Sequence, residues 1–194
     1  MARYLIVGGS RGIGRACAEH LAGQGHSILS VSRTPSETGS WIKADIGTVE
    51  GVRHVVDTVG EDSLDGLLYL GGIWEDGAFT AAYDFLQSPV EETLRVIAVN
   101  LTAPILLAQG LAEPLSKSRN ARIVLIGSTS GIENSGAHEV ANTASKFGLR
   151  GACEALNTSL RPLGIATTVI NPANVATPEV FEDIERGDFG PQVP

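Results

Sequence analysis

Three glycines near the start of the chain have the spacing of a phosphate-binding turn. Gly8, Gly12 and Gly14 end the apolar run 3–9 and open the helical pattern 12–24. Glycine permits a tight turn and close approach of a ligand, and the first turn of the helix offers N–H groups and a positive dipole end to an anion. Such a turn can also contain glycine for conformational reasons alone. In this context we predict that it binds the diphosphate of a dinucleotide.

Two arginines and one aspartate refine the predicted nucleotide. Arg33 ends the second apolar run, where an acidic residue would hold ribose hydroxyls, and Arg11 lies inside the glycine turn. Two cations near the ribose suit a 2′-phosphate, so we predict NADP(H) rather than NAD(H), the alternative being that both are merely solvated. Asp45 and Ile46 follow the third run and suit a contact with adenine, although an aspartate that caps the next helix would look similar.

Further polar residues stand where secondary structure would gather them. Asn142 and Lys146 occupy positions i and i+4 of a helical pattern, so their side chains lie on one face. Ser128 ends an apolar run, and Asn100 lies within a long helical pattern. An amide such as that of Asn142 cannot transfer a proton at any useful pH.

The elements that position these residues are apolar runs alternating with helical patterns. The predicted strands cover 3–9, 27–33, 41–46, 64–72, 121–128 and 165–172, and the predicted helices cover 12–24, 48–60, 88–117 and 141–164. Most runs are apolar throughout, which is typical of strands covered on both faces. We therefore predict an α/β fold, a doubly wound parallel sheet of the Rossmann type with about six strands and helices on both faces.

Local signals define the ends of several elements. Ser88, Pro89 and Glu91 form a helix start signal, and Gly164 is a helix stop signal. The link 34–40 is shorter than the roughly twelve residues of a usual parallel crossover, so we predict no full helix there. We predict that residues 1–177 form the dinucleotide-binding domain and that residues 178–194, with one short amphipathic stretch, form a loosely ordered tail.

Composition and charge argue against several other classes of protein. The chain has 194 residues and a net charge of −8, so we expect neither nucleic acid nor an anionic membrane as a partner. The pattern contains no run of about 18 apolar residues and no room for a signal peptide, so no membrane span is predicted. Cys17 and Cys153 are expected to be reduced and buried, as in a cytoplasmic protein. No metal site is predicted.

The residues from Arg3 to about Thr177 resemble the short-chain dehydrogenase/reductase family. The family's Thr-Gly-xxx-Gly-x-Gly loop is here Val7-Gly8-Gly9-Ser10-Arg11-Gly12-Ile13-Gly14. The family's Asn-Asn-Ala-Gly after the fourth strand is Tyr69-Leu70-Gly71-Gly72, and its Pro-Gly after the sixth is Pro172-Ala173. The family's last strand and substrate lid have no counterpart, so we expect a shortened C-terminus.

The resemblance implies a role for each matching residue. The family's catalytic asparagine, serine and lysine match Asn100, Ser128 and Lys146, and its catalytic tyrosine matches Asn142. The cofactor-binding residues that the resemblance implies are Gly8, Ser10, Arg11, Gly12, Ile13, Gly14, Arg33, Asp45, Ile46, Gly72, Lys146, Pro172, Val175 and Thr177.

The amide at position 142 changes the chemistry that the resemblance implies. In the family, the lysine lowers the pKa of the tyrosine from about 10, the serine holds the substrate oxygen, and the asparagine fixes a water in a proton relay. Asn142 cannot act as that acid, and losing a general acid typically lowers a rate by about 10² to 10⁴. Ser128 and Asn142 together can still polarise a carbonyl as an oxyanion hole does. Water, or His138 four residues before Asn142, is an alternative donor, although an exposed loop histidine is the more ordinary interpretation of His138. Tyr83 is the remaining tyrosine outside the predicted strands.

Two functions stay open. One is an NADP(H)-dependent oxidoreductase that acts on a carbonyl or secondary alcohol of a small molecule, which the retained Asn100, Ser128 and Lys146 favour. The other is a non-catalytic, cofactor-binding homologue that partners or regulates an active relative, which Asn142 favours. A hydrolase is set aside, because the near-match to a nucleophile elbow at 127–131 has Thr129 at its centre.

The resemblance also implies a homodimer in which helices 88–117 and 141–164 pair with their symmetry mates. These segments carry more apolar residues than one face on the sheet requires, including Ile105, Leu106, Phe147, Leu149 and Leu156. The alternative is that all of these residues serve the internal core.

Overall fold

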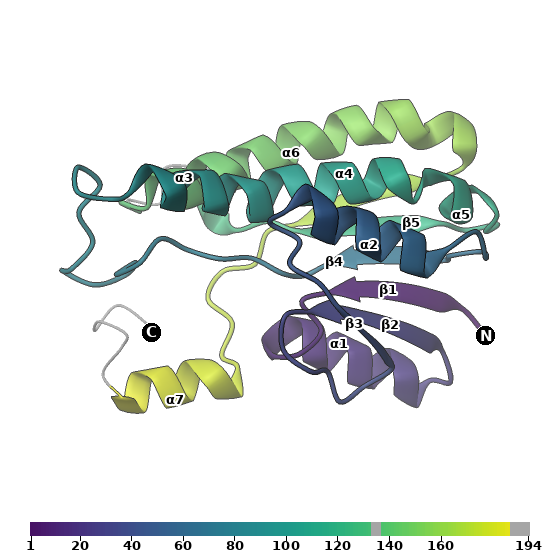
Figure 1. Ribbon diagram of the computed structural model, residues 1–194, viewed down its shortest axis with the longest axis horizontal. Helices are drawn as coiled ribbons and strands as arrows, with labels where there is room; N and C mark the ends of the chain where they lie inside the picture. The colour runs from purple at the N-terminus through teal and green to yellow at the C-terminus, as the bar shows by residue number, and fades with distance from the viewer. Residues whose placement is uncertain (133–136, 187–194) are drawn as a thin grey trace.

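A computed structural model describes residues 1–132 and 137–186 and shows one six-stranded sheet (Figure 1). The strands are β1 (Arg3–Val7), β2 (Ser27–Ser32), β3 (Ser40–Lys43), β4 (Gly66–Tyr69), β5 (Arg122–Ile126) and β6 (Ala166–Ile170). All neighbouring strands are parallel, in the order β3-β2-β1-β4-β5-β6. The predicted doubly wound parallel sheet is therefore confirmed, because β2 and β3 extend the sheet on one side of β1 and β4, β5 and β6 extend it on the other.

Helices cover the two faces of the sheet unequally. The helical elements are α1 (Gly12–Gly23), α2 (Val49–Val59), α3 (Val90–Ile97), η1 (Ala98–Thr102), α4 (Ala103–Gly110), α5 (Ala112–Ser116), η2 (Thr129–Gly131), α6 (Val140–Leu160), η3 (Arg161–Leu163) and α7 (Pro178–Arg186). Helices α2, α4 and α6 lie on one face, and α1 lies on the other, beside β1 and β2 (Figure 1).

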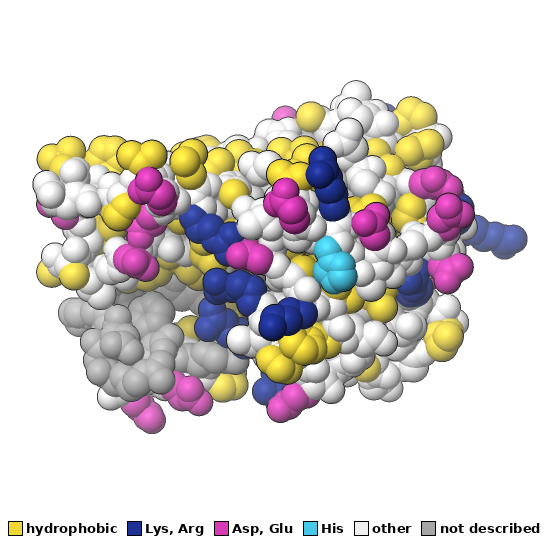
Figure 2. Space-filling model, in the orientation of Figure 1, with side chains coloured by type: hydrophobic (Ala, Val, Ile, Leu, Met, Phe, Trp, Pro, Cys, Tyr) yellow, Lys and Arg dark blue, Asp and Glu magenta, His cyan; other side chains and the backbone are white. Residues whose placement is uncertain are grey.

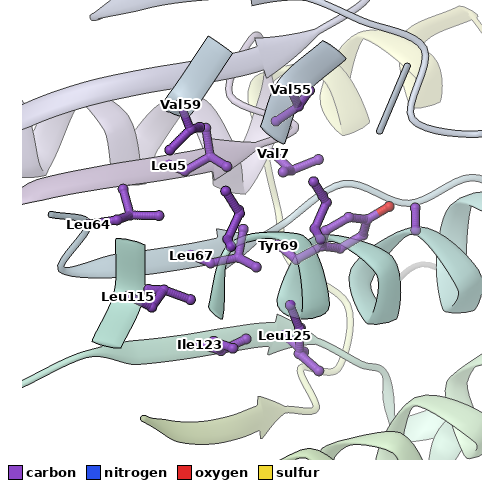
Figure 3. Close-up of a cluster of buried hydrophobic side chains, with 14 of the residues drawn as sticks. Leu5, Val7, Val55, Val59, Leu64, Leu67, Tyr69, Leu115, Ile123 and Leu125 are labelled. Carbon is purple, nitrogen blue, oxygen red and sulfur yellow. The ribbon is translucent and has the colours of Figure 1, made fainter. Parts of the chain in front are cut away.

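The main core fills the space between the sheet and α2, α4, α5 and α6 (Figure 3). Leu5 and Leu67 from the central strands are fully buried against Val55 of α2 and Leu107 of α4. A smaller cluster around Ile6 joins α1 to the opposite face. Each buried side chain of this size contributes about 1.5–3 kcal/mol, so the larger cluster holds the sheet against these helices.

The expected cover on both faces, which applied to most of the strands, does not extend to β6. Val169 packs against the main core, but the side chain of the next residue, Ile170, is 49% exposed. Successive strand residues point to opposite faces, so β6 is open on the face that carries α1.

The predicted helix 88–117 is divided into α3, the π-helical turn η1, α4 and α5. Two prolines explain the breaks, because a proline cannot donate to the carbonyl four residues earlier and its ring crowds that carbonyl. Pro104 acts in this way on Asn100, inside η1, and Pro114 acts on Gly110, where α4 ends. The start signal was also misassigned, since α3 begins after Pro89 and the Ser88 hydroxyl donates to the carbonyl of Asp84 instead of capping the helix.

Other element ends agree with the sequence. Gly164 has a φ of 74° and ends the helical segment that follows α6, as predicted. No helix joins β2 to β3. The amphipathic stretch of the tail forms α7, and residues 187–194 lie outside the described residues.

The apolar residues assigned to a dimer interface divide into two groups. Leu149 is 1% exposed and belongs to the core, so for this residue the assignment was wrong, whereas Leu106 and Leu156 are partly buried and pack against that core. Phe147 is 44% exposed. The sequence interpretation missed three exposed residues of α3 and α6, namely Val90, Leu94 and Val140.

Two further findings concern the membrane and the cysteines. One helical stretch of the described chain, Val90–Gly110, is long and apolar enough to span a membrane, contrary to the prediction, but its residue Leu107 is fully buried in the core. A core helix of a soluble domain meets the same criterion. Cys17 and Cys153 are free thiols, and burial raises the pKa of both; Cys17 is half-buried and Cys153 buried.

Candidate functional site

The glycine turn has a conformation that side chains would block. Gly8 has a φ of 88°, and a Cβ there would stand 2.7 Å from the backbone N of Gly71. A Cβ on Gly14 would stand 2.1 Å from the carbonyl oxygen of Gly8. Helix α1 then begins with an extended N-cap residue, Arg11, whose side chain makes no cap hydrogen bond, and its first turn holds no acidic residue. This helix N-terminus therefore fits the diphosphate that the sequence predicts.

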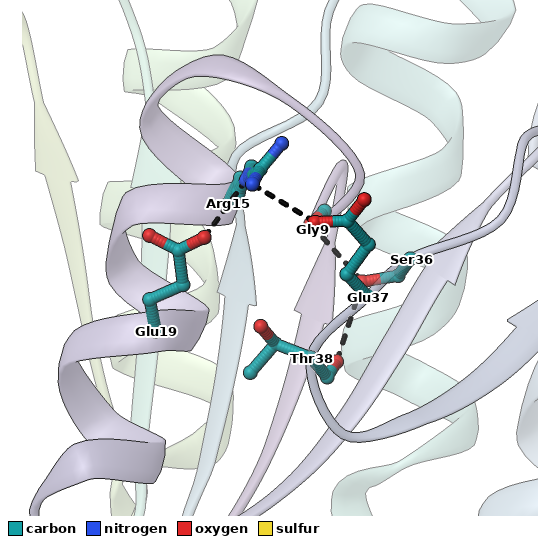
Figure 4. Close-up of polar contacts among 6 residues, drawn as sticks. All are labelled: Gly9, Arg15, Glu19, Ser36, Glu37 and Thr38. Carbon is teal, nitrogen blue, oxygen red and sulfur yellow. Dashed lines mark hydrogen bonds and ion pairs between the residues drawn. The ribbon is translucent and has the colours of Figure 1, made fainter.

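The short β2–β3 loop lies against the glycine turn (Figure 4). The Ser36 hydroxyl donates to the carbonyl of Gly9, over 3.2 Å, and Arg15 of α1 forms an ion pair with Glu37. The hydroxyls of Thr34 and Ser10 are also 3.2 Å apart. These contacts place hydroxyl groups of both loops beside exposed Arg33, at the position expected for the adenosine ribose.

A cleft of about 520 Å³ lies between the end of β2 and helix α3. Its lining includes Arg33, Arg95 and exposed Trp74. Asp45, at the end of β3, accepts hydrogen bonds from the guanidinium of Arg95, 2.7 Å away, and from the N–H of Gly47. Partial burial acts to raise the pKa of Asp45, but these hydrogen bonds outweigh it and lower that pKa.

These contacts change the sequence interpretation of Asp45. The cap of α2 is Thr48, whose hydroxyl accepts the N–H of Gly51, so the cap alternative for Asp45 was wrong. Arg95 was missed, because sequence alone gives no reason to pair residues 50 positions apart. Figure 2 shows Lys and Arg side chains gathered near the middle of this view, next to Asp and Glu side chains.

Asn100 lies in η1, the π-helical turn that precedes Pro104. Its side chain pairs with the backbone of Ile73, accepting from the N–H at 2.9 Å and donating to the carbonyl at 2.8 Å. Its amide also lies 3.3 Å from the Ser145 hydroxyl. π-Helical turns often occur at functional sites, and here the turn places Asn100, which is 1% exposed, against both the end of β4 and α6.

Lys146 is buried in the second turn of α6, with only 5% exposure. Its ammonium donates to the carbonyl of Ile126, at the end of β5, over 3.0 Å. A Cβ on Gly72 would stand 3.6 Å from this nitrogen and 3.5 Å from Oδ1 of Asn100, so both side chains surround Gly72. Burial lowers the pKa of Lys146 to about 8, because a low-dielectric surrounding disfavours the charged form.

Asn142 lies on the same face of α6 and is 4% exposed. Its amide donates to the carbonyl of Ile73 over 3.1 Å, so Ile73 joins Asn100 and Asn142. Ser128 precedes η2, and its hydroxyl accepts the N–H of Ser130. Turn η2 packs on α6, where a Cβ on Gly131 would stand 2.7 Å from the Lys146 carbonyl.

The remaining predicted site residues differ in how close they lie to the glycine turn and to η2. Thr177 lies beside the glycine turn, since a Cβ on Gly12 would stand 3.9 Å from its methyl group. The Pro172 carbonyl accepts the N–H of Thr129, whereas Val175 is 41% exposed. His138 is exposed.

The sequence singled out Tyr83 but not Glu75 or Glu139, and the structure brings these three residues to the start of α6. The Tyr83 hydroxyl accepts the N–H of Val140, 3.2 Å away. The carboxylates of Glu75 and Glu139 are buried where this segment meets α6. The lining residue Trp74 forms an edge-on pair with Phe79, whose φ of 67° is rare for a side-chain-bearing residue.

Comparison with known proteins places this arrangement in a family. The family described as short chain dehydrogenase matches residues 3–186, so the chain belongs to the short-chain dehydrogenase family. Short chain dehydrogenase adrF of Penicillium rubens is 31% identical over 182 residues, covering 89% of this chain and 69% of the relative. The 3-oxoacyl-(acyl-carrier-protein) reductase of Escherichia coli is 29% identical, covering 98% and 81%.

Solved structures show the same fold. A short-chain dehydrogenase from Sphingobium yanoikuyae in complex with NADPH has a TM-score of 0.81 and 26% identity, covering all of this chain and 78% of that one. A short chain dehydrogenase family protein from Francisella tularensis has the same TM-score and identity, covering 98% and 78%. These similarities support an oxidoreductase that uses a nicotinamide cofactor.

Proposed function

We propose that the protein is an NADP(H)-dependent oxidoreductase that reduces a carbonyl group or oxidises a secondary alcohol of a small molecule. The observation that carries this proposal is the meeting of two sites at one edge of the sheet. The glycine turn follows β1, and Gly72, which Asn100 and Lys146 surround, follows the neighbouring β4. Helices leave these two strands toward opposite faces, and such a switch point is where open α/β sheets bind ligands.

The choice of NADP(H) rests on the residues around the glycine turn. Exposed Arg33 lines the cleft, and the hydroxyls of Ser10 and Thr34 lie together beside it. A cation flanked by hydroxyl donors suits a 2′-phosphate, and Arg11 adds a second cation. The Sphingobium relative in complex with NADPH is consistent with this choice.

For the proton we propose Lys146 in place of the absent phenol. When bound, a reduced nicotinamide supplies the hydride to a carbonyl carbon. The substrate oxygen must then receive a proton, which the Asn142 amide cannot give. A lysine with a pKa of about 8 is protonated at pH 7 and near the optimum for a general acid. Lys146 therefore gives up its proton and regains one from solvent, while Ser128 and Asn142 hold the oxygen by hydrogen bonds.

Equilibrium binding and turnover test this function separately. NADPH fluorescence is titrated with the protein, and NADPH consumption is then followed with diketones, quinones and activated ketones. We expect NADPH to bind more tightly than NADH, and at least one carbonyl to be reduced with matching alcohol formation. Absence of binding of either nucleotide would refute the proposal.

A second candidate, a non-catalytic cofactor-binding homologue, is favoured by the hydrogen bond of Asn142. The buried amide of Asn142 donates to the Ile73 carbonyl, which is the kind of contact that a residue with a purely structural role makes. This candidate predicts NADPH binding without reduction of any carbonyl, by both the wild type and the Asn142→Tyr variant.

We also propose a homodimer through α3 and α6. Val90 and Leu94 are one turn apart on α3, and their side chains are 69% and 64% exposed. Val140 and Phe147 lie two turns apart on α6, which packs beside α3. Figure 2 shows hydrophobic side chains along the upper edge, over α3 and the start of α6. A second copy of the chain would bury this apolar edge.

A further inference from the structure

The segment that follows β4 supplies the N-terminal caps of α6. We call residues 73–83 the strap. A helix begins with N–H groups that have no partner within it. The N-cap residue of α6, Glu139, gives no side-chain cap hydrogen bond. The strap accepts the first three N–H groups instead, because the Tyr83 hydroxyl accepts from Val140 and the Glu75 carboxylate accepts from Ala141 and Asn142.

Glu75 is the central residue of this contact. Its Oε1 lies 2.7 Å from the N of Ala141 and 3.2 Å from the N of Asn142, and the residue is 4% exposed. A buried carboxylate is costly unless it is paired or hydrogen-bonded. Here two N–H groups and the positive end of the α6 dipole stabilise it.

The start of α6 also binds the strap in return, and the strap extends to the residues of the candidate site. The side chain of Glu139 does not cap α6 and instead accepts the N–H of Phe79 in the strap at 2.8 Å. At the other end of the strap, Ile73 is hydrogen-bonded to both Asn100 and Asn142. The strap therefore joins the first turn of α6 to the π-helical turn through one continuous set of hydrogen bonds.

We propose that Glu75 is a positioning residue, which holds the first turns of α6 where Asn142 and Lys146 face Asn100. This inference rests on the proposed function for its catalytic meaning. Proton delivery depends on orientation, and small displacements of such groups lower rates strongly. The second oxygen of Glu75 has no hydrogen-bond partner, so a glutamine, which keeps one acceptor oxygen, should replace it well.

The test compares Glu75→Ala with Glu75→Gln, using Asp84→Ala as the matched control. Asp84 is an exposed carboxylate directly after the strap that accepts the N–H of Leu86, and its side chain makes no hydrogen bond or ion pair with α6 among the described residues. Loss of an N-terminal cap should accelerate amide exchange in residues 140–146 of Glu75→Ala by roughly tenfold. NADPH binding should weaken at least threefold, and the kcat of carbonyl reduction should fall further than the affinity does. Glu75→Gln and Asp84→Ala should stay within about twofold of the wild type in all three measurements.

Several outcomes would overturn the inference. One is amide exchange in Glu75→Ala that equals that of the wild type, and another is an equal effect of Asp84→Ala. If Glu75→Ala does not fold, Glu75→Asp, which withdraws the carboxylate by one methylene, should give intermediate exchange, and wild-type exchange there would overturn the inference. If the wild type binds no NADPH, the proposed function fails, and the exchange measurement alone decides whether Glu75 holds α6.

Discussion

Replacement of Lys146 by methionine should make the folded protein more stable. The ordinary lysine pKa of 10.5 falls to about 8 at this buried position. At about 1.36 kcal/mol for each pKa unit, the difference of 2.5 corresponds to about 3 kcal/mol against the charged form at pH 7. Loss of the hydrogen bond to the Ile126 carbonyl lowers the stability of the variant by roughly 1 kcal/mol. The net effect is that Lys146→Met should raise the free energy of unfolding by about 2 kcal/mol.

The pH dependence of this difference has a defined sign. Between pH 8 and 10.5 the unfolded chain binds more protons at Lys146 than the folded protein does, so the wild type gains stability as pH rises. The advantage of Lys146→Met is therefore complete below pH 8 and shrinks above it, by about 2 kcal/mol at pH 9.5. The two cysteines, whose pKa values are raised, oppose this trend equally in both proteins.

Urea unfolding followed by far-ultraviolet circular dichroism at pH 7 and pH 9.5 measures both effects. Lys43→Met, at an exposed lysine of β3, is the matched control and should change stability by less than about 0.5 kcal/mol. A Lys146→Met protein less stable than the wild type at pH 7, or a difference that does not narrow by pH 9.5, would refute the reasoning. Retention of a costly buried cation is itself a sign of function.

Three further outcomes are expected. Arg33→Ala should weaken NADPH binding about tenfold or more and leave NADH binding unchanged, because only the 2′-phosphate loses a charge-assisted hydrogen bond. Equal losses of affinity for both nucleotides would mean that Arg33 does not contact the 2′-phosphate. Asn142→Tyr should raise carbonyl reduction by about 10², because a phenol one turn from Lys146 takes over proton donation to the substrate oxygen from the ammonium of Lys146; a slower variant would mean that the amide takes part in a different mechanism. Leu94→Glu should convert a dimer to a monomer in sedimentation experiments at micromolar concentration, whereas a wild-type monomer would refute the proposed interface.

The fold was accessible from the sequence because its signals are local. Continuous apolar runs, the glycine turn and the short 34–40 link each depend on neighbouring residues, and the parallel, doubly wound sheet followed from the alternation of strands and helices. The division of helix 88–117 was also readable, since Pro104 and Pro114 each remove a helical hydrogen bond four residues earlier. The prediction failed there because apolar periodicity was given more weight than the prolines.

The site was less accessible because its contacts are long-range. No local pattern places Glu75 at the start of α6, 66 residues away, or pairs Asp45 with Arg95. The burial of Lys146, and hence its lowered pKa, depends on β4, β5 and α6 meeting around Gly72. Spacing alone indicated the face that Asn142 and Lys146 share, but not the Ile73 carbonyl that holds Asn142.

The most direct test of the proposed function is the pH dependence of a single turnover of carbonyl reduction with bound NADPH. Stopped-flow measurements from pH 6.5 to 9.5 follow loss of NADPH absorbance with an activated ketone, for the wild type and Lys146→Met. With Lys146 as the acid, the rate should be constant at lower pH, fall with one proton above about pH 8, and be lost in Lys146→Met. A fall already centred near pH 6.5 would indicate a histidine donor, and a rate unchanged across pH 8 would contradict Lys146 as the proton source.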